Sequence, residues 1–101
     1  MTTKSIKPIS VPSIEALETA HSFPAQYLIK IIGPDTEAFR ADAKTICVKH
    51  LGPDAQIETS ERQSKTGQHL ALTLRFQVAT PLLVQEIYKN LAQLTGLKFI
   101  I

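Results

Sequence analysis

The sequence is poor in cysteine and tryptophan and has no long apolar run, and these absences limit the class of protein that it can be. It contains one cysteine and no tryptophan among its 101 residues. The single cysteine, Cys47, has no partner for an internal disulfide, so we expect a reducing, cytoplasmic location. No apolar run approaches the roughly 18 residues of a membrane span. The N-terminal sequence MTTKSIKPISVPS lacks the apolar segment of a secretory signal peptide, so no membrane association is expected.

The excess of positive over negative charge is also small. The formal net charge is +2, which lacks the strong cationic field of a dedicated duplex nucleic-acid binder. The shares of hydrophobic and charged residues, 44% and 20%, are those of a globular chain. We therefore expect a flexible leader over residues 1–12, where two prolines discourage helix, and a single domain over residues 13–101.

Two segments alternate in the manner of interior β-strands. From His69 to Val78, a large apolar residue occupies every second position. In QYLIKIIG, which begins at Gln26, both sides of the strand are apolar, as in the middle of a sheet. Residues 55–62 are mostly polar and suit a short edge strand, and residues 97–101 suit the other edge.

Helix signals separate these strands. Ser13 is placed to cap a short helix that ends near Thr19, and Asp35 to cap a longer one that Gly52-Pro53 ends. Thr80-Pro81 opens a third helix, which ends at Gly96. After the short N-terminal helix, the order is β-α-β-β-α-β. This order predicts an α+β, ferredoxin-like fold, a four-stranded antiparallel sheet with two helices on one face and the first and third strands in its middle.

The motif Ser64-Lys65-Thr66-Gly67 looks like part of a phosphate-binding loop. A P-loop needs glycines before its lysine and leads from a strand into a helix, whereas this segment joins two strands. It is therefore predicted to be a hairpin loop in which Gly67 has a positive φ. The histidines at positions 21, 50 and 69 have no metal-ligand spacing. We expect no metal, no cofactor and no catalytic constellation, and hence no enzyme.

The open face of the sheet is the more informative surface. If the leucines of residues 69–78 face the helices, the outward side chains mix aliphatic residues with cations. Such a surface is either an ordinary solvated sheet or a docking or self-association surface. The central strands place no aromatic residue outward, so stacking of RNA bases is not expected. The candidate partner-binding residues are Leu28, Lys30, Ile32, Arg75, Lys98 and Ile100.

The turn Gly33-Pro34-Asp35 has two interpretations. It is a strand stop followed by a helix cap, or it is a small-anion or amino-acid site at a helix N-terminus, where backbone donors are free. The candidate ligand-binding residues are Gly33, Pro34 and Asp35.

Three stretches, FPAQYLIKIIG, SKTGQHLALTLRF and IYKNLAQLTGLKFII, resemble the YbeD family of small bacterial proteins of unknown function. The resemblance covers about Ser13 to Ile101. It implies a stand-alone ACT-like domain, the ferredoxin-like module that binds amino acids at subunit interfaces in metabolic enzymes, and so supports the fold. It also implies an association with regulation or with lipoate metabolism, but assigns no role to particular residues.

Two hypotheses follow. The first is a non-catalytic regulatory or adaptor domain that binds a partner protein, or a second copy of itself, through its sheet face or an edge strand. The alternative is an ACT-like sensor that holds an amino acid or another small carboxylate near Gly33 to Asp35 at a dimer interface.

Overall fold

The structure is a computed structural model that describes residues 11–101. Most of the predicted leader, residues 1–10, lies outside the described residues. The elements follow in the predicted order, a short helix and then β-α-β-β-α-β. They are α1 (Ile14–Ala20), β1 (Ala25–Pro34), α2 (Glu37–Leu51), β2 (Glu58–Gln63), β3 (His69–Val78), α3 (Pro81–Leu91) and β4 (Phe99–Ile100).

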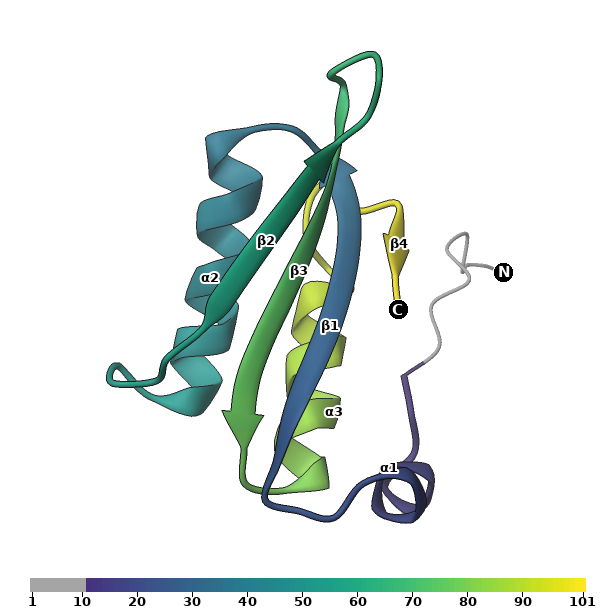
Figure 1. Ribbon diagram of the computed structural model, residues 1–101, viewed down its shortest axis with the longest axis vertical. Helices are drawn as coiled ribbons and strands as arrows, with labels where there is room; N and C mark the ends of the chain where they lie inside the picture. The colour runs from purple at the N-terminus through teal and green to yellow at the C-terminus, as the bar shows by residue number, and fades with distance from the viewer. Residues whose placement is uncertain (1–10) are drawn as a thin grey trace.

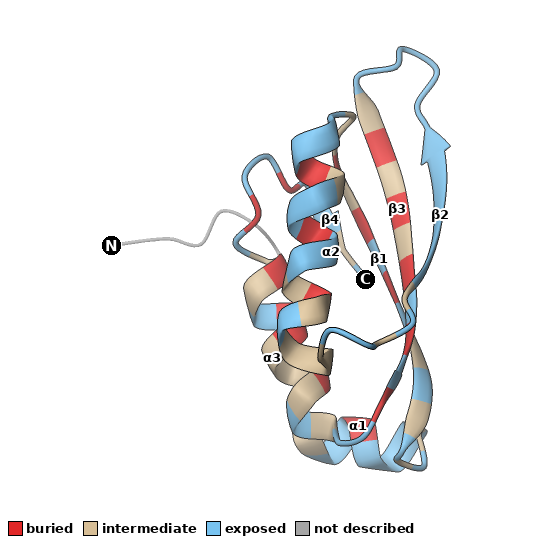
Figure 2. Cartoon of the chain, turned by 90° about the vertical axis from the view of Figure 1, so that its left-hand side faces the viewer, coloured by how far each residue is buried: buried red, intermediate tan, exposed pale blue. Residues whose placement is uncertain are grey.

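The four strands form one antiparallel sheet in the order β2-β3-β1-β4, which confirms the ferredoxin-like prediction. Helices α2 and α3 lie against the same face of this sheet, and α1 lies at its lower end (Figures 1 and 2). In the part of the chain that the structure describes, no element covers the opposite face, which we call the open face. The two richest strands stand in the middle, as predicted.

The core lies between the sheet and the helices. Pairs such as Ile29 with Leu74 and Ile31 with Leu72 lie directly opposite each other on β1 and β3, and all four side chains are buried. On β3 the buried residues alternate with more exposed ones along the whole strand, as Figure 2 shows. Burial of these aliphatic side chains contributes about 1.5–3 kcal/mol for each residue, so this alternation fixes which side of β3 faces the helices.

The helix caps follow the sequence in two cases out of three. Ser13 Oγ accepts a hydrogen bond from the Ala16 amide, and Thr80 caps α3, whose first residue is Pro81. The prediction that Asp35 caps α2 is wrong. Thr36 is the cap, and its Oγ1 accepts from the Phe39 amide at 3.1 Å.

The segment Ser64-Lys65-Thr66-Gly67 is the predicted hairpin loop. Gly67 has a φ of 74°, which only glycine adopts readily. The Gly67 amide donates to the Ser64 carbonyl at 3.0 Å, and the Ser64 amide donates to the His69 carbonyl at 2.9 Å. The loop therefore joins β2 directly to β3 and does not lead into a helix.

The C-terminal part of the chain departs from the prediction. Helix α3 ends at Leu91 and does not continue to Gly96. Turns follow, and they bury Leu94 and Leu97 against the core. Gly96 has a φ of 82°, and a Cβ atom there would lie 2.9 Å from Cδ of Pro34, so the chain passes close to the end of β1 before it enters β4.

Candidate functional site

The middle of the open face consists of three rows of side chains on neighbouring strands; the pair Pro34 and His69 lies above them, and the pair Gln26 and Gln77 lies below. Residues directly opposite each other on antiparallel strands point to the same side of the sheet, so the pairings define the rows. Ile101 extends β4 by one residue, because its amide and carbonyl both hydrogen-bond Lys30, at 2.9 and 3.3 Å. From the hairpin downward, the rows are Arg62, Ala71, Ile32 and Phe99; then Ser60, Thr73, Lys30 and Ile101; then Glu58, Arg75 and Leu28.

One half of this face, over β1 and β4, is exposed to solvent and, apart from the charged Lys30, apolar. The exposed fractions are 45% for Leu28, 54% for Phe99 and 68% for Ile101. Ile32 lies beside Phe99 in the first row and is partly buried. We call these four residues the apolar half of the open face. Large apolar side chains that lie together in this way are typical of interaction surfaces.

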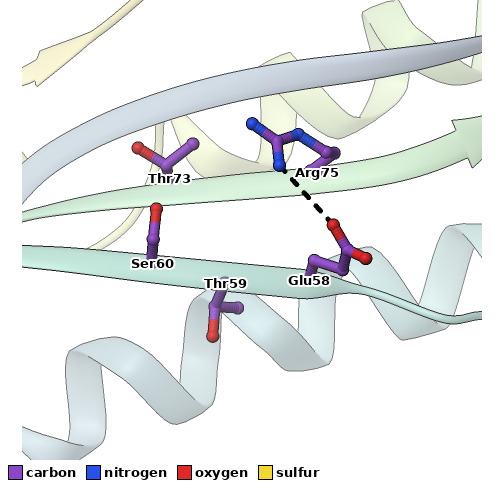
Figure 3. A pocket seen from close by; sticks show the side chains of 5 residues that line it. All are labelled: Glu58, Thr59, Ser60, Thr73 and Arg75. Atoms are coloured by element: carbon purple, nitrogen blue, oxygen red, sulfur yellow. Dashed lines mark ion pairs between the residues drawn. The ribbon is translucent and has the colours of Figure 1, made fainter.

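The other half, over β2 and β3, is polar and shallowly hollowed (Figure 3). Ser60 and Thr73 are short side chains opposite each other, and Arg75 Nη1 lies 3.5 Å from Glu58 Oε1. These four residues, with Thr59, line a hollow of about 370 Å³. In Figure 3, Thr59 points to the other side of the strand, as the alternation requires.

Cations outnumber anions on the open face. Lys30, Arg62 and Arg75 are exposed there, and Glu58 is the one side-chain carboxylate in the three rows. Within residues 11–101, no carboxylate lies within 4.0 Å of the Lys30 ammonium or the Arg62 guanidinium. Both charges are therefore available to a partner.

Four of the six predicted docking residues share this face: Leu28, Lys30, Ile32 and Arg75. The prediction that Ile100 faces outward is wrong, because Ile100 lies opposite the buried Ile31 and packs against the core. Lys98 lies one residue before β4, and its amide donates to the Ile32 carbonyl at 2.7 Å. Leu97 is buried in the preceding turn and not in the strand, so the alternation shifts by one residue before Phe99.

Five residues of the three rows were missed by sequence reasoning: Glu58, Ser60, Arg62, Phe99 and Ile101. Phe99 and Ile101 take the places expected for Lys98 and Ile100. Arg62 lies opposite Ala71, and its position follows from the hairpin register. Extending the hairpin pairing backward from Gln63 and Leu70 would have identified it.

The predicted ligand-binding turn is closely packed. Gly33 is buried, and a Cβ atom there would lie 2.4 Å from Cζ of Phe39. The ring of Phe39, from α2, thus fills the space beside Gly33. The next residue, Pro34, packs closely against Gly96.

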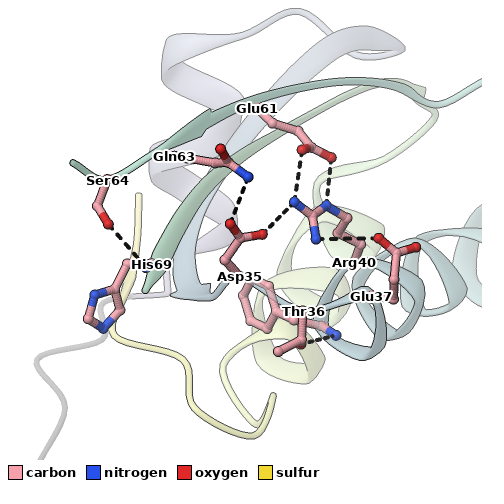
Figure 4. A network of polar contacts seen from close by, with 9 residues as sticks. Asp35, Thr36, Glu37, Arg40, Glu61, Gln63, Ser64 and His69 are labelled. Atoms are coloured by element: carbon pink, nitrogen blue, oxygen red, sulfur yellow. Dashed lines mark hydrogen bonds and ion pairs between the residues drawn. The ribbon is translucent and has the colours of Figure 1, made fainter. Parts of the chain in front are cut away.

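Asp35 belongs to a polar network that joins α2 to β2 (Figure 4). Its Oδ1 lies 2.6 Å from Arg40 Nη2, and its Oδ2 accepts a hydrogen bond from Gln63 Nε2 at 2.7 Å. The Arg40 guanidinium also binds both carboxylate oxygens of Glu61, at 2.8 and 3.1 Å. Hydrogen bonds to Glu61 and then to Asp35 raise the pKa of Arg40. These contacts explain why Asp35 does not cap the helix.

The remaining reactive side chains lie apart from one another. Cys47 is fully buried, and burial raises its pKa to about 11. His50 Nε2 accepts a hydrogen bond from Asn90 at 3.1 Å, and the ring of His21 lies 5.0 Å from that of Tyr27. Among the described residues, no three His, Cys, Asp or Glu side chains gather as metal ligands would. No helix within residues 11–101 is long and apolar enough to cross a membrane.

The comparisons with known proteins identify a family and no function. No curated protein matches the chain. The sequence pattern of one family, described as proteins of unknown function (DUF493), matches residues 18–101. This range includes every element after α1 and the whole open face. The chain therefore belongs to the DUF493 family, which is the YbeD family that its sequence resembles.

Proposed function

We propose that this protein is a non-catalytic adaptor or regulatory domain that binds a partner protein through the open face of its sheet. The observation that carries the proposal is the group of large apolar side chains, Leu28, Phe99 and Ile101, exposed on one uncovered face. Burial of such apolar surface against a partner stabilises the complex by about 25 cal/mol for each Å² removed from water. No comparable group of exposed large apolar residues lies on the helices among the described residues, where only Leu82 is exposed.

The charges around the apolar half support the same function. Interfaces commonly have an apolar centre with polar and charged groups around it, and arginine is enriched there. Lys30 and Arg75 lie next to Ile101 and Leu28 in the rows of the open face. They supply orientation and steering, and the apolar half supplies contact area.

The edge strand β4 adds a second means of attachment. Ile101 exchanges both of its backbone hydrogen bonds with Lys30 of β1, so by the antiparallel alternation the amide and carbonyl of Ile100 point away from the sheet. An extended segment of a partner can add to such an edge through main-chain hydrogen bonds.

The alternative, an amino-acid sensor at Gly33 to Asp35, has less support. Phe39 fills the space beside Gly33. The nearby cation, Arg40, already pairs with three carboxylates, those of Asp35, Glu37 and Glu61, so an incoming carboxylate would have to displace one of them. We therefore favour the docking surface.

The test is an affinity capture from extract of the source cells, treated with nuclease, with the double variant Lys30→Glu/Arg75→Glu beside the native chain. A captured stoichiometric protein should bind the variant about tenfold more weakly or worse, a loss of about 1.4 kcal/mol. The melting temperature should change little, because exposed substitutions usually stay within about 0.5 kcal/mol.

The matched control is Lys44→Glu/Lys49→Glu, which makes the same charge change at exposed positions of α2. It should bind as the native chain does. Equal loss of binding in both double variants would show a general charge effect and count against the open face.

A further inference from the structure

We infer that the partner presents an acidic, amphipathic segment to the open face. Its carboxylates meet Lys30 and Arg62, and its apolar side chains cover the apolar half. This inference rests on the proposed function, because it names the chemistry of the segment that docks there.

The position of Lys30 carries the argument. It stands in the middle row, between Thr73 on β3 and Ile101 beyond β4, and the exposed apolar residues Leu28 and Phe99 lie one row away on either side. A partner that covers these apolar residues must also remove water from the Lys30 ammonium. Removing an unpaired charge from water costs several kcal/mol unless an opposite charge replaces the water. The partner must therefore bring a carboxylate to this point.

Arg62 supplies a second contact of the same sign. It is exposed at the end of the first row, and the small side chain of Ala71 lies beside it. With Ile32, His69 and Ala71 it borders a hollow of about 200 Å³. A guanidinium binds a carboxylate with two parallel hydrogen bonds, so this hollow suits an acidic side chain.

The net charge of the face selects against other partners. Counting side chains, three cations and one anion leave it at 3 − 1 = +2. Arg75 already lies beside Glu58, so the unmatched charge rests on Lys30 and Arg62. A basic segment would be repelled, and a neutral one would leave the Lys30 charge without water or a partner.

The part of the face that holds the charged and large apolar side chains has the dimensions of a single segment. Four strands about 4.8 Å apart span about 14 Å, and these three rows about 7 Å apart span about 14 Å along the strands. A helix about 10 Å across, or an extended chain, fits it. Lys30 and Arg62 are two strands and one row apart, roughly 12 Å, which corresponds to carboxylates about two helical turns apart.

The experiment selects binders of the full chain from a random-peptide display library and compares them with the unselected library. Enriched peptides should carry net negative charge together with large apolar residues. A synthetic copy of the best peptide should shift the backbone amide signals of β1 and β4. The variant Lys30→Glu/Arg62→Glu should weaken it at least tenfold, whereas Lys44→Glu/Lys49→Glu should not. Its affinity for the native chain should fall as salt is raised.

The outcomes separate this inference from the proposed function. Neutral or basic peptides that shift the open-face amides and bind Lys30→Glu/Arg62→Glu equally well would overturn the acidic partner and leave the docking surface standing. Selected peptides that shift only amides elsewhere, or no enrichment at all, would overturn both. A single-stranded RNA oligomer that binds the open face more tightly than any selected peptide would also overturn a protein partner.

Discussion

At the scale of single residues, Gly33 shows how a turn residue can be needed for packing. A Cβ atom there would lie 2.4 and 2.5 Å from two atoms of the Phe39 ring. Because ring and backbone are both buried, Gly33→Ala should destabilise the protein by about 1–3 kcal/mol, the usual cost of overpacking. Urea unfolding measures this. In the background of Phe39→Leu, which removes the ring, the same change should cost much less. Equal costs in both backgrounds would contradict the contact.

Cys47 gives a pH dependence whose sign follows from its burial. Burial raises its pKa from 9.0 to about 11, so between these values the folded thiol keeps its proton while the unfolded one loses it. Unfolding then releases a proton, and the free energy of unfolding should decrease from about pH 9 to 11, by up to about 3 kcal/mol. Urea unfolding at several pH values should show a shallower decrease for Cys47→Ala. Tyr88, whose pKa burial also raises, is present in both proteins and cancels in the comparison. Parallel pH profiles would mean that the thiol already ionises in the folded state.

Local residue patterns predicted local features. Ser13 as a cap and Gly67 at a positive φ depend on neighbours within a few positions, and the structure confirms both. Asp35 failed as a cap because its partners, Arg40 and Gln63, come from a helix and a strand that the fold brings together. The sequence around Asp35 holds no sign of that contact.

At the scale of elements, the length of the pattern decided what could be predicted. Strand β3 was predicted with its observed bounds, because ten alternating residues leave one phase. Strand β4 was not, because it has two residues and a buried turn residue, Leu97, directly before it. In so short a strand, the pairing with β1 decides which side chains face the core, and the residue pattern does not reveal that pairing.

The phase of β4 can be tested with two neighbouring substitutions. Phe99→Ser changes an exposed side chain and should alter the free energy of unfolding by less than about 0.5 kcal/mol. Ile100→Ser changes a side chain packed against the core and should cost about 1–2 kcal/mol, less than a fully buried isoleucine. Urea unfolding compares the two. A larger cost for Phe99→Ser than for Ile100→Ser would mean that Phe99 faces the core and Ile100 faces outward, as the sequence predicted.

At the scale of the whole molecule, the sequence predicted the location of the open face better than its composition. Alternation on β1 and β3 correctly put Leu28, Lys30 and Arg75 on one face. The aromatic residue of that face, Phe99, was missed, because it comes from the strand whose phase was wrong. The apolar half therefore emerges only when the sheet is assembled.

The same assembly predicts how the molecule behaves toward its own copies. Two open faces, each with a net side-chain charge of +2 and an exposed apolar half, repel each other at long range and attract on contact. The Debye length falls from about 30 Å at 0.01 M salt to about 3 Å at 1 M, so salt screens the repulsion, but it does not remove the cost of burying the Lys30 charge without a carboxylate. Sedimentation should therefore show a monomer at low and at high salt, while binding of an acidic peptide weakens over the same range. Lys30→Gln/Arg62→Gln should dimerise even at low salt, because it lacks the two unmatched charges. A native dimer that dissociates as salt is added would mean that ion pairs hold the copies together and that a different surface joins them.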